Sequence, residues 1–251
     1  MKKDKLAPLD TDELIKDLKF NKEDATAAVT KAVISSIPLL GGPVTELFDA
    51  VTTPMLSKRR DKWIILFAEA INELSSRLDE FRFEKLPENE MFIDTVMHAT
   101  QIAIRNHQEE KLSALKNAVI NSAIIDIEED LQIIFLDLID SFTSLHLRFL
   151  KFLNEPKSKE FVEELNENII EVEAESIGGV SYLVFDLGEV LEYEYPDLKS
   201  KNHIYEHVLK DLQSKELLIY DNFRIDPNGK MESLMMPMGE MLLTFIKSPE
   251  I

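Results

Sequence analysis

The stretch "IEEDLQIIFLDLIDSFTSLHLRFLKFLN", residues 127–154, decides the fold class of this chain. As a single helix it would carry apolar side chains on most of its sides, which leaves little surface suited to water. A helix of this kind is typical of the centre of a bundle, where neighbouring helices cover it. We therefore predict a mainly α-helical N-terminal bundle in which residues 127–154 form the central helix.

The segments before this helix have the amphipathic pattern expected of its neighbours. Residues 55–83 carry one apolar stripe at three- and four-residue spacing. Its members are Trp63, Phe67, Ile71, Leu74 and Leu78. The further helices are predicted over residues 11–20, 24–37, 87–106 and 109–124 and from Pro43 onward. The predicted bundle covers residues 1–153.

Composition and charge narrow the class of protein. The chain has 251 residues, a net charge of −19 and no cysteine, so disulfides, thiolate nucleophiles and cysteine-ligated zinc are excluded. An acidic surface of this kind repels nucleic acid unless basic residues gather in one patch. The basic N-terminus has no apolar run behind it and no run of 18 apolar residues exists, so we predict neither a signal peptide nor a membrane span. We expect a cytoplasmic protein.

Residues 154–177 are interpreted as an acidic linker with a short helix. Residues 154–198 hold 13 acidic residues against Lys157 and Lys159 alone, and the predicted linker leads into Gly178-Gly179. Such a shift in composition, followed by a glycine pair, marks a domain boundary. The second domain is therefore predicted over residues 178–251.

The second domain has a different order of elements. Residues 178–193 predict a helix, with a strand as the alternative because they are rich in β-branched and aromatic residues. Residues 201–220 predict a helix that leads into a short strand, and residues 223–236 predict two strands joined by a turn. Residues 236–248 close the chain with a helix. This order favours a small α+β domain of the winged-helix type.

The C-terminal part resembles the winged-helix modules of many bacterial proteins. The matching segments are residues 207–212, 217–219 and 236–246, although Met236 stands where the family often has threonine. The resemblance covers roughly residues 178–248 and implies a helix, a strand, a wing and a final helix. The N-terminal half is similar to uncharacterised bacterial helical proteins, some of which are encoded among phage-defence genes. That similarity rests on Ile37 to Pro43 and on Lys58-Arg59-Arg60, and it implies a biological context rather than an activity.

An uncharged segment, Ala32 to Thr45, leaves three interpretations open. A helix of this length would be about 21 Å long, which is short of the roughly 30 Å bilayer core. A buried helical corner is the main interpretation. A surface for a membrane or a partner is the second, because a basic run follows at residues 58–62, and a ligand loop is the third. The candidate interaction residues here are Leu39, Leu40, Leu47 and Phe48.

Two groups of residues could carry metal or acid–base chemistry. His203, Glu206 and His207 spell the H-x-x-E-H pattern of an inverted zinc-protease motif, in which two histidines one helical turn apart share a metal. Helical spacing also places four carboxylates on one face, those of Asp126, Asp130, Asp137 and Asp140. We interpret the first group as part of a small helical domain and the second as a solvated face, with a metallohydrolase as a remote alternative.

The predicted winged helix could contact DNA or protein. Residues 199–251 hold 7 basic and 8 acidic residues, and the candidate nucleic-acid contacts are Lys210, Arg224 and Lys230. Binding to phosphates needs several basic contacts, so this charge favours a protein partner. Methionines adapt to irregular surfaces, which makes Met235, Met236 and Met238 candidate interaction residues.

These observations favour a non-enzymatic bacterial protein-interaction or regulatory protein, in the phage-defence context that the N-terminal similarity implies. We expect no cofactor and no metal. One alternative is a membrane-acting effector that uses residues 32–62, and another is a winged-helix transcription regulator.

Overall fold

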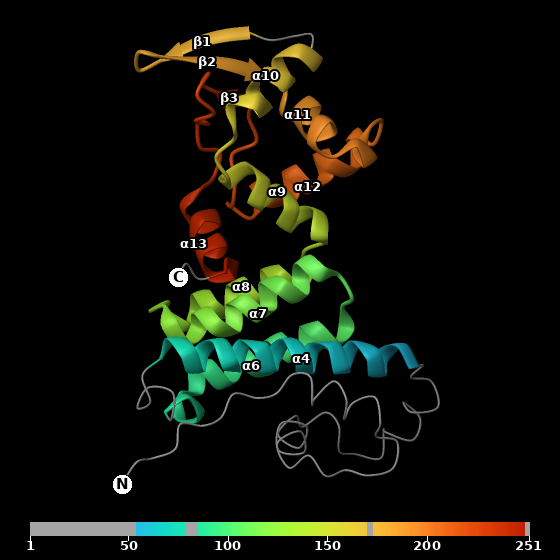
Figure 1. Cartoon of the computed structure of the whole chain (residues 1–251), viewed down its shortest axis with the longest axis vertical. Helices are drawn as coiled ribbons and strands as arrows, with labels where there is room; N and C mark the ends of the chain where they lie inside the picture. The colour runs from blue at the N-terminus through green and yellow to red at the C-terminus, as the bar shows by residue number, and fades with distance from the viewer. Residues whose placement is uncertain (1–53, 79–84, 170–172, 249–251) are drawn as a thin grey trace. The chain divides into compact units, whose positions relative to one another are not determined.

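The computed structural model describes residues 54–78, 85–169 and 173–248 (Figure 1). This part of the chain contains nine α-helices, two short 3-10 helices and one three-stranded antiparallel sheet. The prediction of a mainly α-helical chain is therefore confirmed, together with a small sheet toward the C-terminus. The described residues fall into two compact units, one of residues 54–141 with 245–248 and one of residues 142–244.

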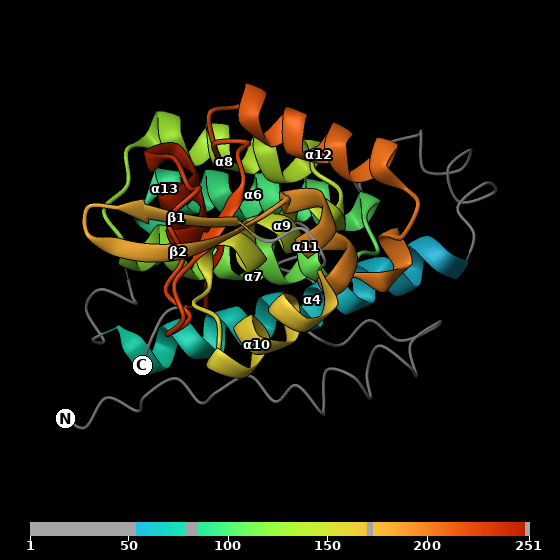
Figure 2. The same ribbon diagram turned by 90° about the horizontal axis from the view of Figure 1, so that it is seen from above.

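The first unit is a bundle of four helices. They are α4 (Pro54–Arg77), α6 (Glu90–Arg105), α7 (Glu109–Ile124) and α8 (Glu129–Ser141), with the 3-10 helix η2 (Leu86–Glu88) before α6. Helix α6 packs against α4, α7 and α8, and α7 also contacts α4 and α8 (Figure 2). No helix in the described ranges is both long enough and apolar enough to cross a membrane.

The core of this bundle follows the apolar stripes of the sequence. Trp63, Leu74 and Leu78 of the predicted stripe on α4 are buried, and Ile102 of α6 and Phe135 of α8 are completely covered. The indole of Trp63 donates a buried 2.9 Å hydrogen bond to Thr100, so its polar group is satisfied without water. Burial of these large side chains is the main source of stability for the unit.

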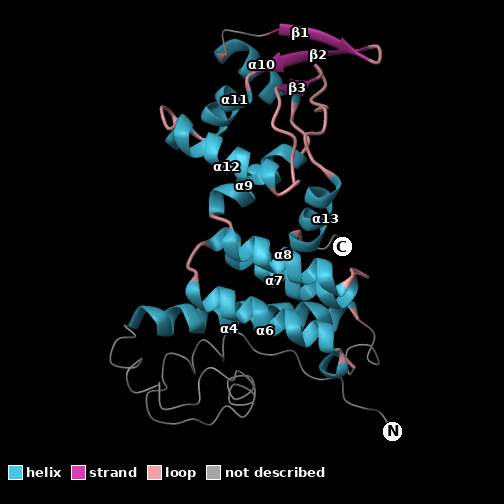
Figure 3. Cartoon of the chain, turned by 180° about the vertical axis from the view of Figure 1, so that it is seen from behind, coloured by secondary structure: helices cyan, strands magenta, loops and turns pink. Residues whose placement is uncertain are grey.

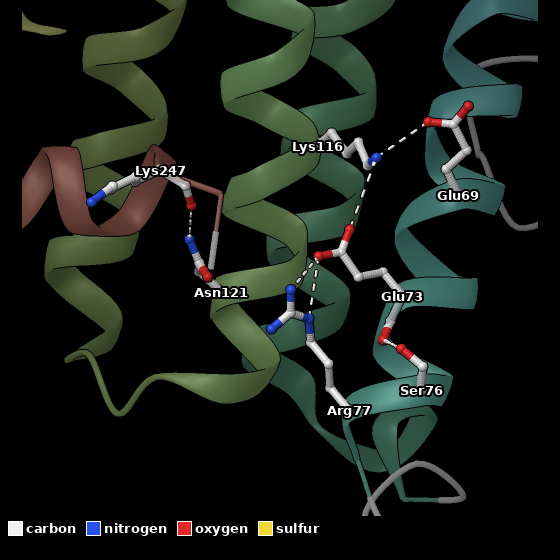
Figure 4. A network of polar contacts seen from close by, with 7 residues as sticks. All are labelled: Glu69, Glu73, Ser76, Arg77, Lys116, Asn121 and Lys247. Atoms are coloured by element: carbon white, nitrogen blue, oxygen red, sulfur yellow. Dashed lines mark hydrogen bonds and ion pairs between the residues drawn. The ribbon is translucent and has the colours of Figure 1, made fainter. Parts of the chain in front are cut away.

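A polar network joins α4 to α7 at the edge of this core (Figure 4). The ammonium group of Lys116 on α7 lies 3.2 Å from Glu69 and 3.9 Å from Glu73, both on α4. Arg77 lies one turn after Glu73 and donates a 2.7 Å hydrogen bond to it. These half-exposed ion pairs fix the register of the two helices more than they stabilise the fold.

The second unit combines helices with the sheet (Figure 3). Its elements are α9 (Ser144–Asn154), α10 (Lys159–Asn168), β1 (Glu173–Ile177), β2 (Val180–Phe185), α11 (Leu187–Glu194), η3 (Pro196–Leu198), α12 (Asn202–Ser214), β3 (Phe223–Ile225) and α13 (Pro237–Ile246), whose last two residues count with the first unit. The strands follow the order β1-β2-β3, and each pair is antiparallel.

Aromatic rings fill the space between α9 and the sheet. The ring of Phe152 lies at the centre, with centroids 6.0 Å from Phe161, 5.9 Å from Tyr195 and 6.1 Å from Phe223. Such offset and edge-on pairs add to the stabilisation from area burial. Because Phe223 belongs to β3, this cluster connects α9 to the base of the sheet.

The predicted central helix over residues 127–154 is wrong as one continuous element. Helix α8 ends at Ser141 and α9 begins at Ser144, and the division between the two units falls at this break. Thr143 has an extended backbone and precedes α9 as its N-cap, and the ring of His146 accepts a 3.2 Å hydrogen bond from the Thr143 N–H. A threonine can either continue a helix or cap the start of a new one. Thr143 caps α9 here, because the His146 ring completes the cap.

The predicted linker and the predicted helix after it are also different in the structure. Residues 154–177 contain α10 and β1, so this acidic segment is built into the second unit. The helix predicted over residues 178–193 is wrong for residues 180–185, where the strand alternative holds, and right for α11. Gly178 and Gly179 have φ of 59° and 83°, which suits a hairpin turn and explains why β2 folds back on β1.

Candidate functional site

The β1–β2 hairpin of the second unit is exposed along the whole of β1 and at its turn. Its two strands are aligned over five residue pairs, from Glu173 opposite Val184 to Ile177 opposite Val180. All five residues of β1 are exposed, and the apolar pair Ile177 and Val180 at the turn is 37% and 41% exposed. Two β-branched side chains kept in water at a hairpin tip are typical of contact surfaces rather than of a core.

Arg224 is the basic residue nearest to this hairpin, and carboxylates surround it. Its guanidinium lies 2.9 Å from Glu175 of β1, 2.9 Å from Asp221 and 3.6 Å from Glu232. The hydrogen bonds that Arg224 donates to Glu175 and Asp221 raise its pKa well above the usual range, and its side chain is only 16% exposed. Two of the guanidinium donors are hydrogen-bonded to acids of this chain and a third carboxylate lies within ion-pair distance, so a phosphate that approached Arg224 would meet negative charge.

The other two candidate nucleic-acid contacts lie on separate elements. Lys210 of α12 is exposed and donates a 3.0 Å hydrogen bond to Glu206, one turn earlier on the same helix. Lys230 is exposed in the turn after β3, where its backbone N–H donates to Asp226. Of the three candidates, Arg224 and Lys210 are thus paired with acids of this chain.

The methionine candidates divide between core and surface. Met235 is buried and forms an isolated bridge with Leu218, while Met236 and Met238 are half-buried beside the start of α13. The next residue is Gly239, and a side chain at this position would collide with the carbonyl of Leu217. The segment is therefore tightly packed on its inner side.

The candidate metal ligands are spread over the surface. His203 and His207 are exposed on α12, and Glu206 between them is paired with Lys210. On α8, Asp137 lies 3.4 Å from His98 and Asp140 lies 2.8 Å from Arg105. Asp126 and Asp130 are exposed, and the described residues contain no group of three or more side chains placed to hold a metal.

The uncharged segment and its four candidate residues, Leu39, Leu40, Leu47 and Phe48, lie outside the described residues. The basic run at residues 58–62, which follows this segment, belongs to α4, and its first residue, Lys58, is exposed. Arg59 donates to the carbonyl of Arg105, Arg60 lies 3.3 Å from Asp61, and the ammonium of Lys62 pairs with Glu109. Three of these four cations therefore contact acceptors of this chain.

Two features of the second unit were not found from the sequence. The first is a surface hollow of about 420 Å³ whose lining includes Asn154, Lys157, Asn228 and Lys230. The Lys157 ammonium lies 3.8 Å from the centre of the Phe152 ring, and burial lowers its pKa to about 8 although Glu155 and Glu194 act in the opposite direction. Residues about seventy positions apart form this hollow, so no local pattern could have indicated it.

The second feature is a chain of hydrogen bonds between α9 and α12. The ring of His146 contacts the hydroxyl of Thr143 at 2.8 Å through Nδ1 and a carboxylate oxygen of Asp211 at 3.2 Å through Nε2. Burial lowers the pKa of His146, while Asp211 opposes that shift. Nδ1 also accepts a hydrogen bond from the Thr143 N–H. Capping of α9 therefore explains the order hydroxyl, imidazole and carboxylate, and we do not interpret Thr143 as a catalytic nucleophile.

Comparison with known proteins adds no assignment to this geometry. No family model, no curated protein and no solved structure matches the chain.

Proposed function

We propose that this chain is a non-enzymatic bacterial protein-interaction or regulatory protein whose C-terminal part is a winged-helix-like module that contacts protein. The order β2, α11, α12, β3, turn and α13 supports the winged-helix assignment. In that assignment α12 occupies the place of the recognition helix, and the turn after β3 occupies the place of the wing.

One observation carries the choice of protein over DNA. Arg224, one of the three candidate nucleic-acid contacts, forms ion pairs with Glu175, Asp221 and Glu232. Together these groups carry an excess of negative charge where a winged helix that reads DNA would present cations. To contact Arg224, DNA phosphates would have to displace carboxylates that already pair with it. The free energy lost in breaking these ion pairs offsets the free energy gained from the phosphate contacts. Exposed apolar residues, Ile204 on α12 and Ile219 beyond it, suit a protein partner instead.

The proposal can be tested by site-specific photo-crosslinking. A benzophenone amino acid is placed at Ile204 or Ile219 of the full chain, and irradiation is carried out in the bacterium that encodes it. We expect protein adducts of defined mass from these two positions, and none of those masses from a control position at Ser113, which is exposed on α7.

A parallel measurement tests the DNA alternative. Fluorescence anisotropy with a random-sequence duplex is measured at 50 mM and 200 mM salt, for the wild type and for Lys210→Ala with Lys230→Ala. We expect no saturable binding. Binding that falls steeply with salt and is lost in the double variant would refute the proposal in favour of the transcription regulator.

A further inference from the structure

We infer that the outer edge of β1 is a docking site for an extended, basic segment of a partner protein, which joins the sheet as a fourth strand. This inference rests on the proposed function, since it adds a second contact surface to that of Ile204 and Ile219 and gives the chemistry of the segment that binds there. Strand addition of this kind gains affinity from main-chain hydrogen bonds and specificity from alternate side chains.

Among the described residues, the outer edge of β1 has no partner strand. The sheet has the order β1-β2-β3, and within the described residues no strand pairs with the side of β1 that faces away from β2. All five residues of β1 are exposed. A strand edge in this state presents a row of backbone donors and acceptors that another chain can complete.

The edge is also preformed, because the hairpin turn fixes the strand. The φ values of Gly178 and Gly179 match a type I′ turn, which is closed by a bond between the residues that flank it, Ile177 and Val180. Bonded and non-bonded pairs alternate along an antiparallel ladder, so Glu175 and Glu173 also bond toward β2. The N–H and C=O groups of Ala174 and Ser176 therefore point outward, and they are the groups that a fourth strand would meet.

The side chains of β1 specify a basic partner. Glu173, Glu175 and Ile177 share one face of the strand, and the small residues Ala174 and Ser176 occupy the other. Glu175 already contacts Arg224, but Glu173 has no cation within ion-pair distance in the part of the chain that the structure describes. A partner strand is thus stabilised by lysine or arginine opposite the two glutamates and by an aliphatic residue opposite Ile177.

The same side chains disfavour a second copy of this chain as the occupant. Antiparallel pairing of two β1 strands over their full length places Glu175 directly opposite Glu175, and a shift by two residues, which keeps the same backbone groups bonded, places Glu173 opposite Glu175. Like charges directly opposite are destabilising in a sheet, and the net charge of −19 adds repulsion between copies. The glutamates therefore protect the edge from self-association and leave it open to a basic strand.

The test uses the full chain and two synthetic peptides labelled with fluorescein. The first is acetyl-Thr-Val-Thr-Lys-Thr-Lys-Thr-amide, which in antiparallel pairing sets its lysines opposite Glu175 and Glu173 and its valine opposite Ile177. The second has glutamate in place of both lysines. We expect anisotropy titrations to show at least about tenfold tighter binding of the lysine peptide, from two favourable in place of two unfavourable charge pairs.

Two proline variants separate the edge from the rest of the hairpin. Ser176 and Ser181 are exposed cross-strand partners, and the backbone of Ser176 faces the outer edge while that of Ser181 faces the opposite side. Proline removes one donor in each case without touching the bonds between β1 and β2. We expect Ser176→Pro to weaken binding of the lysine peptide by about fivefold or more, which corresponds to one hydrogen bond, and Ser181→Pro to change it less than twofold.

A charge variant provides a readout that does not depend on proline being tolerated. Glu173→Lys should abolish most of the preference, because each peptide then makes one favourable and one unfavourable charge pair with residues 173 and 175. Equal effects of the two proline variants, or an unchanged preference in Glu173→Lys, would overturn the inference. If crosslinks from Ile204 and Ile219 persist in that case, the proposed function stands and only the β1 site is lost.

Discussion

Removing the side-chain amide of Asn121 should destabilise the first unit strongly. Asn121 is completely buried on α7, and its Nδ2 donates a 2.8 Å hydrogen bond to the carbonyl of Phe245. It donates a second, of 2.9 Å, to the carbonyl of Lys247 (Figure 4). These carbonyls belong to the end of α13 and the residue after it. The last carbonyls of a helix have no partner within the helix, so the amide supplies what the helix itself lacks.

The magnitude follows from the two bonds and from what remains after their loss. Each hydrogen bond contributes about 1 kcal/mol, and a buried carbonyl left without a donor costs about 1–2 kcal/mol more. Phe245 is fully buried, so water does not replace the amide at its carbonyl. We therefore expect Asn121→Ala to lower the free energy of unfolding of the first unit by about 3 kcal/mol.

The assay is urea unfolding followed by tryptophan fluorescence. The chain has a single tryptophan, Trp63, which is 2% exposed in the core of the first unit, so its emission reports unfolding of that unit. The matched control is Asn117→Ala, because Asn117 is half-buried one turn earlier and makes one 2.9 Å bond, to the carbonyl of Ile246. We expect a loss of about 1 kcal/mol for the control. A loss for Asn121→Ala no larger than that of the control would refute the reasoning.

Three further changes have defined outcomes. Gly229→Ala should lower the thermal midpoint of the second unit far more than Gly178→Ala. Both glycines have positive φ, but only a Cβ at residue 229 would collide with the carbonyl of Lys157. Similar midpoints of the two variants by circular dichroism would contradict this. The stability of the second unit should fall as pH drops below about 6.5, because burial holds the folded pKa of His146 below its unfolded value and the unfolded state then binds more protons; His146→Gln should flatten this dependence in urea titrations. Stability should likewise rise between pH 8 and about 10.5, where unfolded but not folded Lys157 is protonated, and Lys157→Met should remove that rise.

Helical periodicity predicted much of the first unit correctly. The stripe on α4 is buried at Trp63, Leu74 and Leu78, and α6 and α7 lie where acidic starts and apolar faces indicated them. The pattern failed at Phe142 and Thr143. Apolar residues continue through this point at helical spacing, and the break is decided by a cap whose second half, the His146 ring, is held by Asp211 on α12.

The hairpin shows the same limit in the second unit. The helix predicted for residues 180–185 is wrong, and the β-branched and aromatic residues that left a strand as the alternative were the better local signal. Strand formation there depends on β1 and β3 lying on either side of β2, which gives each residue a partner in the ladder.

The candidate site was largely beyond the reach of the sequence. Lys210, Arg224 and Lys230 are named correctly as cations, yet the acids that neutralise Arg224 come from β1, from the segment before β3 and from the residues after it. Glu175 and Arg224 are 49 positions apart, so only the register of the sheet brings them together.

By itself, the sequence determined the helical class, the acidic charge and the absence of cysteine chemistry. Each of these depends on composition or on neighbours a few residues away, where spacing and backbone preference act directly. The tertiary structure alone decided where the long apolar stretch breaks, that β1 is an edge strand among the described residues, and that Arg224 forms ion pairs with acids of this chain. These features depend on hydrogen bonds and charges between distant segments, whose energies exist only once the chain has folded.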